Sequence, residues 1–337
     1  MKDFFVADAP QHQGQDVQAC FAVISKQSRE KKDGGVYLAL VLGDRTGRME
    51  ARIWDNCDVH ARRFESGDIV AVRGSVETFG GKQQLKINEI AKAKPGSFQL
   101  EDFLRTTTRN IPAMWEELRT VAASFTDADL RRLVFAFLDD PEIAQRYQAA
   151  PAAKMMHHAW VGGLLEHVVD LCKFCNLAAE HFPLIHRDLL LTGAILHDIG
   201  KIYELSWGTS FEYTLEGQMI GHISIGTRLL NEKVSTLPGF PERVRILVEH
   251  IILSHHGTHE FGSPKLPMIP EAVLLHYLDD AEAKMLAMLE ACAPTTPGTA
   301  PPEYVDRVRA LDRGMINTRQ FLAGAFAGET RIAKENS

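Results

Sequence analysis

Residues 191–201 read LTGAILHDIGK, and this stretch decides the fold of the second half of the chain. The apolar residues up to Leu196 have the composition of a buried helix, which Gly200 then ends. At the end of that helix, His197 and Asp198 offer an imidazole nitrogen and a carboxylate oxygen to one metal ion. Taken alone the pair is a weak signal, because a histidine beside an aspartate is usually structural.

Further histidines and carboxylates occupy similar apolar helical surroundings on both sides of this stretch. They are His167 upstream, and His222, the His255-His256 pair and the Asp279-Asp280 pair downstream. An unpartnered imidazole or carboxylate costs free energy in apolar surroundings. A hydrogen bond to a neighbour would explain any one of these residues, but a shared metal site explains all of them together. We therefore expect several helices to converge on metal ions.

The length and composition of the chain fit a soluble protein of two domains. Its 337 residues exceed the ~100–200 residues of an ordinary domain, and 45% of them are hydrophobic and 24% charged. No segment approaches the ~20 consecutive apolar residues that span a membrane. The first residues also lack the apolar core of a signal peptide. We expect a cytoplasmic protein that makes no membrane contact.

Charges and cysteines add two further expectations. Residues 1–97 hold 15 Lys and Arg against 13 Asp and Glu, whereas residues 98–337 hold 22 against 31. A slightly basic front part and an acidic back part are compatible with phosphate contact in the first and metal binding in the second. The five cysteines are scattered, which predicts reduced thiols. We interpret Cys172 and Cys175 as core packing, since no second pair completes a zinc site.

The first part of the chain has the pattern of a small β-barrel. Alternating apolar positions predict strands at residues 17–28, 36–44, 48–54, 69–79 and 82–91, with a short helix and loop at 55–68. Five short strands with one helical connection before the fourth match the layout of an OB-fold. We expect residues 1–97 to form such a nucleic-acid-binding domain.

Helical spacing prevails after Pro95. It covers residues 101–107, 111–125, 127–138 and 141–149, and beyond 155 it is interrupted only at 206–214, 257–267 and 293–302. We expect residues 98–150 to be a helical connector that packs on an all-α bundle at 151–325. Residues 326–337 are polar and should fray. The predicted fold class is thus an all-β barrel followed by an all-α helical bundle.

One outer face of the predicted barrel suits a single-stranded nucleic acid. Alternation along the third strand places Arg48, Arg52 and Trp54 on the outside. Cations meet phosphates there, and aromatic rings stack on bases. The candidate binding residues are Tyr37, Arg48, Arg52, Trp54, Phe79 and Lys86. The alternative is that these charges are only solvated, with Trp54 buried against a neighbouring domain.

The order of the histidines and aspartates resembles the HD-domain phosphohydrolase superfamily over about residues 155–290. The segments that carry the resemblance are HHAWVGGLLEH (157–167), LHDIGK (196–201), EGQMIGHISIG (216–226), LSHHGTHEFG (253–262) and LLHYLDD (274–280). With the barrel in front, the whole chain looks like the bacterial YhaM-type 3′→5′ exoribonucleases, which pair an OB-fold with an HD domain. The resemblance implies a metal-dependent hydrolase of single-stranded RNA, with some activity on DNA. It also implies release of nucleoside monophosphates and a preference for manganese.

The same resemblance assigns roles to individual residues. His167, His197, Asp198 and Asp279 match the four metal ligands of the superfamily. The further residues His222 and His255 or His256 resemble the ligands of a second ion in the two-metal subset, where Asp198 would bridge. We favour Asp279 over the adjacent Asp280, and both members of the His255-His256 pair remain candidates. Iron, cobalt or nickel would also suit such a mixture of imidazoles and carboxylates.

Three more residues are candidates for substrate or supporting contacts. Lys201 follows the His-Asp pair by three residues and can reach a phosphate oxygen as a point charge. His157 and His158 are candidates for contacts with a metal ligand or with the substrate. The competing interpretation is a helix-end lysine in solvent and histidines that serve helix packing.

Two other functions would use the same features. An HD-type phosphohydrolase of small nucleotides would share every metal ligand but would not need the barrel. A nucleic-acid-binding protein with an inactive helical scaffold would need the barrel but not a complete set of ligands. The presence of both features favours a nuclease. Its predicted partner is single-stranded RNA or DNA.

Overall fold

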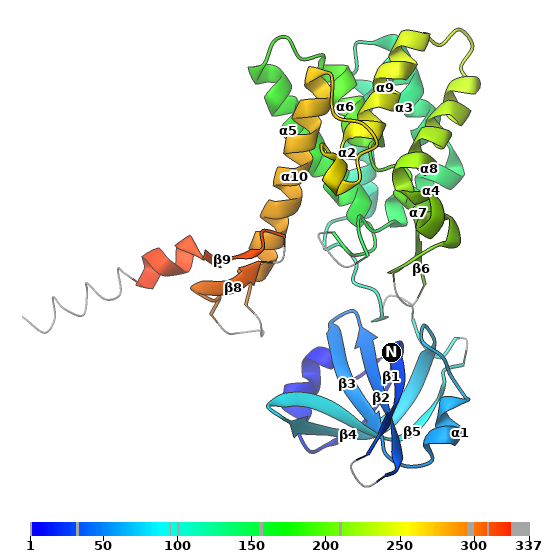
Figure 1. Cartoon of the computed structure of the whole chain (residues 1–337), viewed down its shortest axis with the longest axis vertical. Helices are drawn as coiled ribbons and strands as arrows, with labels where there is room; N and C mark the ends of the chain where they lie inside the picture. Colours follow the sequence, from blue (N-terminus) through cyan, green and yellow to red (C-terminus); the bar gives the residue numbers. More distant parts are fainter. Residues whose placement is uncertain are drawn as a thin grey trace, which may run out of the picture.

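The computed structural model describes residues 2–31, 34–94, 96–99, 102–154, 158–208, 211–294, 300–308 and 310–324. A β-barrel lies at one end of the molecule and a bundle of helices at the other (Figure 1). The predicted order of an all-β domain and a helical domain is therefore confirmed. No helix of the described residues is long and apolar enough to cross a membrane.

The barrel closes because its strands pair in the order β1-β2-β3-β5-β4. The strands are β1 (Asp16–Glu30), β2 (Val36–Asp44), β3 (Gly47–Ile53), β4 (Ile69–Phe79) and β5 (Lys82–Lys92). A 3-10 turn, η1 (Val6–His12), precedes β1, and the helix α1 (Cys57–Ala61) connects β3 to β4. Apolar side chains such as Phe21, Leu42 and Leu85 fill the interior. The OB-fold prediction is confirmed.

The linker between the domains is extended and is held by both of them. A helix was predicted at 101–107, and from Asp102 onward this is wrong, because no α-helix forms there. Phe103 is instead buried beside Ala22 and Ile69 of the barrel. Two residues on, the Val161 amide of the helical domain donates to the carbonyl of Arg105 at 2.8 Å. The apolar side chains that suggested a helix therefore serve contacts with the barrel.

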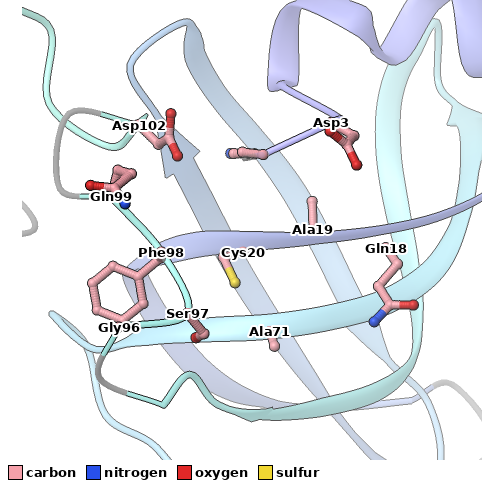
Figure 2. A pocket seen from close by; sticks show the side chains of 11 residues that line it. Asp3, Gln18, Ala19, Cys20, Ala71, Gly96, Ser97, Phe98, Gln99 and Asp102 are labelled. Carbon is pink, nitrogen blue, oxygen red and sulfur yellow. The ribbon is translucent and has the colours of Figure 1, made fainter.

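Where the linker crosses the barrel it encloses a pocket of about 400 Å³. Figure 2 shows linker residues Phe98, Gln99 and Asp102 on one side of this pocket and Asp3 on the other, with Cys20 of β1 between them. None of its lining residues is a histidine. The pocket is therefore distinct from the histidine clusters of the helical domain.

The helical domain is built around one almost completely buried helix. Its helices are α2 (Ile111–Ala123), α3 (Ala128–Leu138), α4 (Pro141–Ala149), α5 (Gly163–His181), α6 (Arg187–Leu196), α7 (Lys201–Glu204), α8 (Leu215–Ser235), α9 (Glu242–Ser254) and α10 (Pro270–Ala291). Every residue of α6 from Asp188 to Leu196 is buried, and the helix contacts α3, α5, α9 and α10. This packing places the residues that follow α6 at the centre of the bundle.

Two short hairpins interrupt the helical region. β6 (Leu205–Trp207) pairs with β7 (Phe211–Tyr213) inside the predicted loop at 206–214. β8 (Tyr304–Val308) pairs with β9 (Arg313–Ile316), where helix was expected, so that expectation is wrong. Tyr304, Val305 and Val308 belong to the aromatic and β-branched types that are enriched in strands. The loop predicted at 257–267 contains the short turn η3 (His259–Phe261), and residues 326–337 lie outside the described residues.

Candidate active site

The four residues expected to bind a first metal ion lie together at the centre of the helical domain. They come from α5, from the end of α6 and from α10. His167 Nε2 lies 3.4 Å from His197 Nε2 and 3.2 Å from Asp279 Oδ1. His197 Nε2 lies 3.3 Å from Asp198 Oδ2 and 4.0 Å from Asp279 Oδ1. We name these residues cluster 1.

A second group of side chains shares Asp198 with cluster 1. Asp198 Oδ1 lies 3.4 Å from His222 Nε2 and 3.6 Å from His255 Nε2. His256 joins them, since one ring nitrogen from each of the three histidines lies within 4.8 Å of the others. We name Asp198 and these histidines cluster 2. One oxygen of Asp198 therefore faces each cluster.

Hydrogen bonds behind the imidazoles leave lone pairs pointing into the clusters. The Nδ1 atoms of His197 and His255 donate to the carbonyls of Ala194 at 3.0 Å and Ile252 at 2.8 Å. A neutral imidazole with its proton on Nδ1 has only a lone pair on Nε2. Among the described residues, the buried atoms Asp198 Oδ1, His222 Nε2 and His255 Nε2 have no hydrogen-bond partner. Acceptors that face one another in this way fit a bound cation.

The ionisation of these groups agrees with a metal-binding role. Burial, together with nearby His197, lowers the pKa of His255 well below its ordinary 6.5, and burial also lowers the pKa of His256. Both imidazoles are therefore neutral, as metal ligation requires. Burial alone would raise the pKa of Asp198, but Lys201 and His197 outweigh it and hold this pKa well below 3.8. His255, His256 and Asp198 thus offer neutral nitrogens and an anionic oxygen, a set that suits a divalent transition metal.

Known proteins resemble this chain over nearly its whole length. It is 36% identical to the 3′-5′ exoribonuclease YhaM of Bacillus velezensis over 300 residues, which is 89% of this chain and 93% of that protein. The YhaM proteins of Geobacillus sp. and Listeria innocua are 34% and 35% identical over 300 residues, with 90% and 94% of those proteins covered. The chain belongs to the YhaM family of 3′-5′ exoribonucleases. The HD domain family matches residues 164–284, and the family of OB-fold nucleic acid binding domains matches residues 22–93.

Two buried carboxylates hold the histidines of this YhaM-family site from behind, and the sequence did not single them out. Glu282 accepts from His167 Nδ1 at 2.9 Å and lies 2.7 Å from His158 Nε2. Glu204 accepts from both the backbone amide and Nδ1 of His222, at 3.0 Å each. Glu282 follows Asp279 by three residues and so shares a helix face with it. This spacing from Asp279 was the feature of the sequence from which a role for Glu282 at the site could have been predicted.

Glu282 also changes the charge of cluster 1. Burial alone would lower the pKa of His167, but Asp279 and Glu282 outweigh it and raise this pKa to about 10. Burial would raise the pKa of Glu282, yet its bonds to His158 and His167 lower it to about 2. The carboxylates therefore draw positive charge to His167. A metal cation can supply that charge in place of a proton.

Two glycines allow α7 and α8 to carry these side chains so close together. A Cβ atom on Gly200 would lie 2.0 Å from the carbonyl oxygen of His222, so no larger residue fits there. Gly221 has φ 77° and ψ 156°, which interrupts α8, and such angles are nearly confined to glycine. The break frees the backbone amide of His222 to bond Glu204.

Three remaining candidates of the helical domain lie in different environments. Lys201 Nζ lies 2.6 Å from Asp198 Oδ2 and is largely buried. Asp280 bonds Lys284 at 2.6 Å and not the clusters. His158 is buried against Glu282, which also bonds His167, and the centroids of the two imidazole rings lie 5.6 Å apart. His157 lies outside the described residues.

The six candidate residues of the YhaM-family barrel share one outer face. The rings of Tyr37 and Trp54 stack with centroids 4.8 Å apart. The Arg52 guanidinium lies 4.9 Å from the ring of Phe79, which is 62% exposed. Lys86 pairs with Arg52 across the β3–β5 register, and Arg48 lies further along β3. The aromatic rings thus stack on partners within the barrel and leave Phe79 open to solvent.

Proposed function

We propose that the chain is a metal-dependent 3′→5′ exonuclease that hydrolyses single-stranded RNA, and also single-stranded DNA, to nucleoside monophosphates. The observation that carries the proposal is Asp198, whose two oxygens face two clusters of inward-pointing lone pairs. Its YhaM relatives are named 3′-5′ exoribonucleases and are similar across both domains. The barrel favours a strand over a free nucleotide as the substrate.

The clusters support two ion sites. His167, His197, Asp198 and Asp279 would hold the first ion. Asp198, His222 and His255 would hold the second, with His256 beside them. Imidazole and carboxylate ligands suit manganese, iron, cobalt or nickel better than calcium. We favour manganese because the family resemblance implies it.

Hydrolysis requires a neutralised phosphoryl group and an activated water, and bound divalent ions would supply both. The chain itself adds the ammonium group of Lys201. Burial alone would lower the pKa of Lys201, but Asp198 outweighs burial and raises it. Lys201 is therefore a fixed positive charge at neutral pH, and we assign it to a phosphoryl oxygen and not to proton transfer. Asp198 orients Lys201 through the 2.6 Å contact.

Labelled oligoribonucleotides test the proposal directly. A 5′-labelled strand incubated with the protein and Mn²⁺ should shorten stepwise, whereas a 3′-labelled strand should release its label in the first mononucleotide. A chelator should stop both reactions, and a DNA strand run in parallel measures the second activity. Asp198→Asn serves as the inactive control. An intact strand beside hydrolysed free nucleotides would instead identify a small-nucleotide phosphohydrolase.

A further inference from the structure

The barrel and the helical domain face each other across the linker (Figure 1). Residues of both domains and of the linker line a cleft of about 710 Å³. Ile24 and the residues from Gly43 to Arg48 line it on the barrel side, and linker residues Phe103 to Arg105 line it as well. Lys154, Ala159, Phe211, Glu212 and Glu290 of the helical domain line the remainder. Neither domain alone forms this cleft.

Four cations from three parts of the chain line the cleft, namely Arg45, Arg48, Arg105 and Lys154. Each carboxylate of the lining has a basic partner: Asp44 bonds Lys2, Glu212 bonds Lys154, and Glu290 lies 3.3 Å from Arg105. Arg45 and Arg48 are exposed and make no ion pair with the described residues. The cleft thus presents positive charge from the barrel side, which suits a phosphate backbone.

Chains of contacts connect both walls of the cleft to the residues that hold the metal clusters. On one wall, the Arg105 guanidinium lies 4.8 Å from the ring of Trp160, and that ring lies 5.1 Å from His158. His158 contacts Glu282, which holds His167 of cluster 1. On the other wall, β7 leads to Thr214, whose amide bonds the carbonyl of Glu204 at 2.9 Å. The carboxylate of Glu204 holds His222 of cluster 2.

The opposite end of the cleft continues onto the outer face of the barrel. Arg48, at the cleft, is the second residue of β3, and Arg52 points to the same side of the strand. Trp54 follows directly after β3 and stacks on Tyr37. Trp54 follows Arg48 by six positions, so a strand rise of ~3.3 Å per residue places the two ~20 Å apart. Aromatic rings and cations therefore line the face from Trp54 to the cleft, and the one carboxylate between Arg48 and Arg52 on β3, that of Glu50, lies 3.8 Å from the Arg52 guanidinium.

We propose that the cleft is the passage through which the 3′ end of the strand reaches the metal clusters. The strand then lies along β3, with its 5′ part on Trp54 and Tyr37 and its 3′ part over Arg48. The last phosphates before the catalytic centre contact Arg45, Arg105 and Lys154. The inference rests on the proposed function, because a 3′→5′ exonuclease must admit the 3′ end first.

Photo-crosslinking tests this polarity in the intact chain without hydrolysis. Oligoribonucleotides that each carry one 4-thiouridine at a different distance from the 3′ end are bound in the presence of a chelator, irradiated and mapped by mass spectrometry. Positions near the 3′ end should label Lys154, Ala159 or residues 211–213, later positions the β2–β3 turn, and the most distant positions Tyr37 or Trp54. The reverse order, or a cleft that is never labelled, overturns the proposal.

Arg45→Glu gives a second test through binding affinity in the same chelated buffer. The variant should bind a labelled strand severalfold more weakly, and its plot of log Kd against log salt should be shallower by ~0.7 for each phosphate that the protein no longer neutralises. Arg62→Glu, an exposed cation just after α1, should bind like the wild type. An unchanged Kd and slope for a folded Arg45→Glu, or for Arg45→Gln if the reversal unfolds, contradicts the passage.

The two proposals fail in different ways. If the wild-type protein with Mn²⁺ leaves the labelled strand intact, the proposed function fails whatever the crosslinks show. If the strand is degraded from its 3′ end but the crosslinks run in the opposite order, the function stands and the passage is wrong.

Discussion

Two adjacent aspartates show what a sequence can and cannot decide about single residues. Asp279 and Asp280 point ~100° apart on α10, and only the rotation of the helix in the bundle decides which one faces His167. Buried Ala272 and Leu275 set that rotation. The His255-His256 pair differs, because α9 ends at Ser254 and both rings then contact His222.

Paired substitutions test the choice between these aspartates. Asp279→Asn removes a carboxylate from cluster 1, so bound metal and RNA hydrolysis should fall by more than the ~10–100-fold typical of a supporting residue. Asp280→Asn removes only a partly exposed partner of Lys284 and should stay near wild type. Elemental analysis and the rate on labelled RNA measure both effects. Equal losses in the two variants would reject the assignment of Asp279.

Glu282 should act on the metal only through His167. Glu282→Gln keeps the shape of the side chain but weakens its bonds to His167 and His158. We expect metal affinity to fall ~10–100-fold, as measured by titration of the metal-free protein. Activity should return toward wild type at saturating metal, which Asp279→Asn should not do. A loss of activity that excess metal leaves unchanged would place Glu282 in another role.

At the scale of elements, local signals were read correctly and long-range ones were missed. Asn110, Asp127 and Asp140 each accept a bond from a backbone amide in the first turn of a helix, so α2, α3 and α4 were predictable from their own residues. The helix predicted around Phe103 was wrong because the ring of Phe103 packs on barrel residues that are distant in sequence. The helix predicted where β8 and β9 form was wrong for a related reason. Each of these strands is stabilised by pairing with the other, which the local pattern of either one does not reveal.

Asp188 connects two of these elements and predicts a pH dependence of stability. Its carboxylate accepts from the amides of Thr126 at 2.6 Å and Asp127 at 2.9 Å, just before α3. Burial alone would raise the pKa of Asp188, but these donors outweigh it and hold the pKa below 3.8. A depressed pKa adds stability above the unfolded-state pKa, and this stability is lost as the pH falls through the folded-state pKa.

Asp188→Asn should therefore lower the free energy of unfolding by ~1–3 kcal/mol at neutral pH. The difference from the wild type should shrink as the pH falls below the ordinary aspartate pKa of 3.8. Denaturant unfolding of both proteins across this pH range, followed by circular dichroism, provides the measurement. Asp139→Asn, whose exposed carboxylate pairs with Arg119, is the matched control and should have little effect. A penalty that is independent of pH would mean that charge on Asp188 does not stabilise α3.

At the scale of the whole molecule, the two domains and their order were predictable, but their mutual arrangement was not. Strand alternation and helical spacing are local properties, so the fold class of each domain can be predicted from its own stretch of sequence. The cleft depends on contacts between segments far apart in the chain. One example is the bond from the Arg45 amide to the Asp102 carbonyl at 2.9 Å. Arg45, Arg105 and Lys154 therefore carried no signal as substrate contacts until the fold placed them together.

A division of labour between the domains gives the last prediction. If the barrel holds the nucleic acid, a triple variant with alanine at Arg48, Arg52 and Trp54 should have weaker affinity for long single strands. The same variant should spare hydrolysis of a dinucleotide, if a dinucleotide needs only the clusters. Kinetics on both substrates at several salt concentrations provide the measurement, and the salt dependence on long strands should decrease. A control variant that replaces Val59, Arg62 and Arg63 removes a similar set of exposed side chains from another part of the barrel and should behave like the wild type. Equal losses on the long strand and on the dinucleotide would mean that this face of β3 supports the fold of the enzyme and does not hold its substrate.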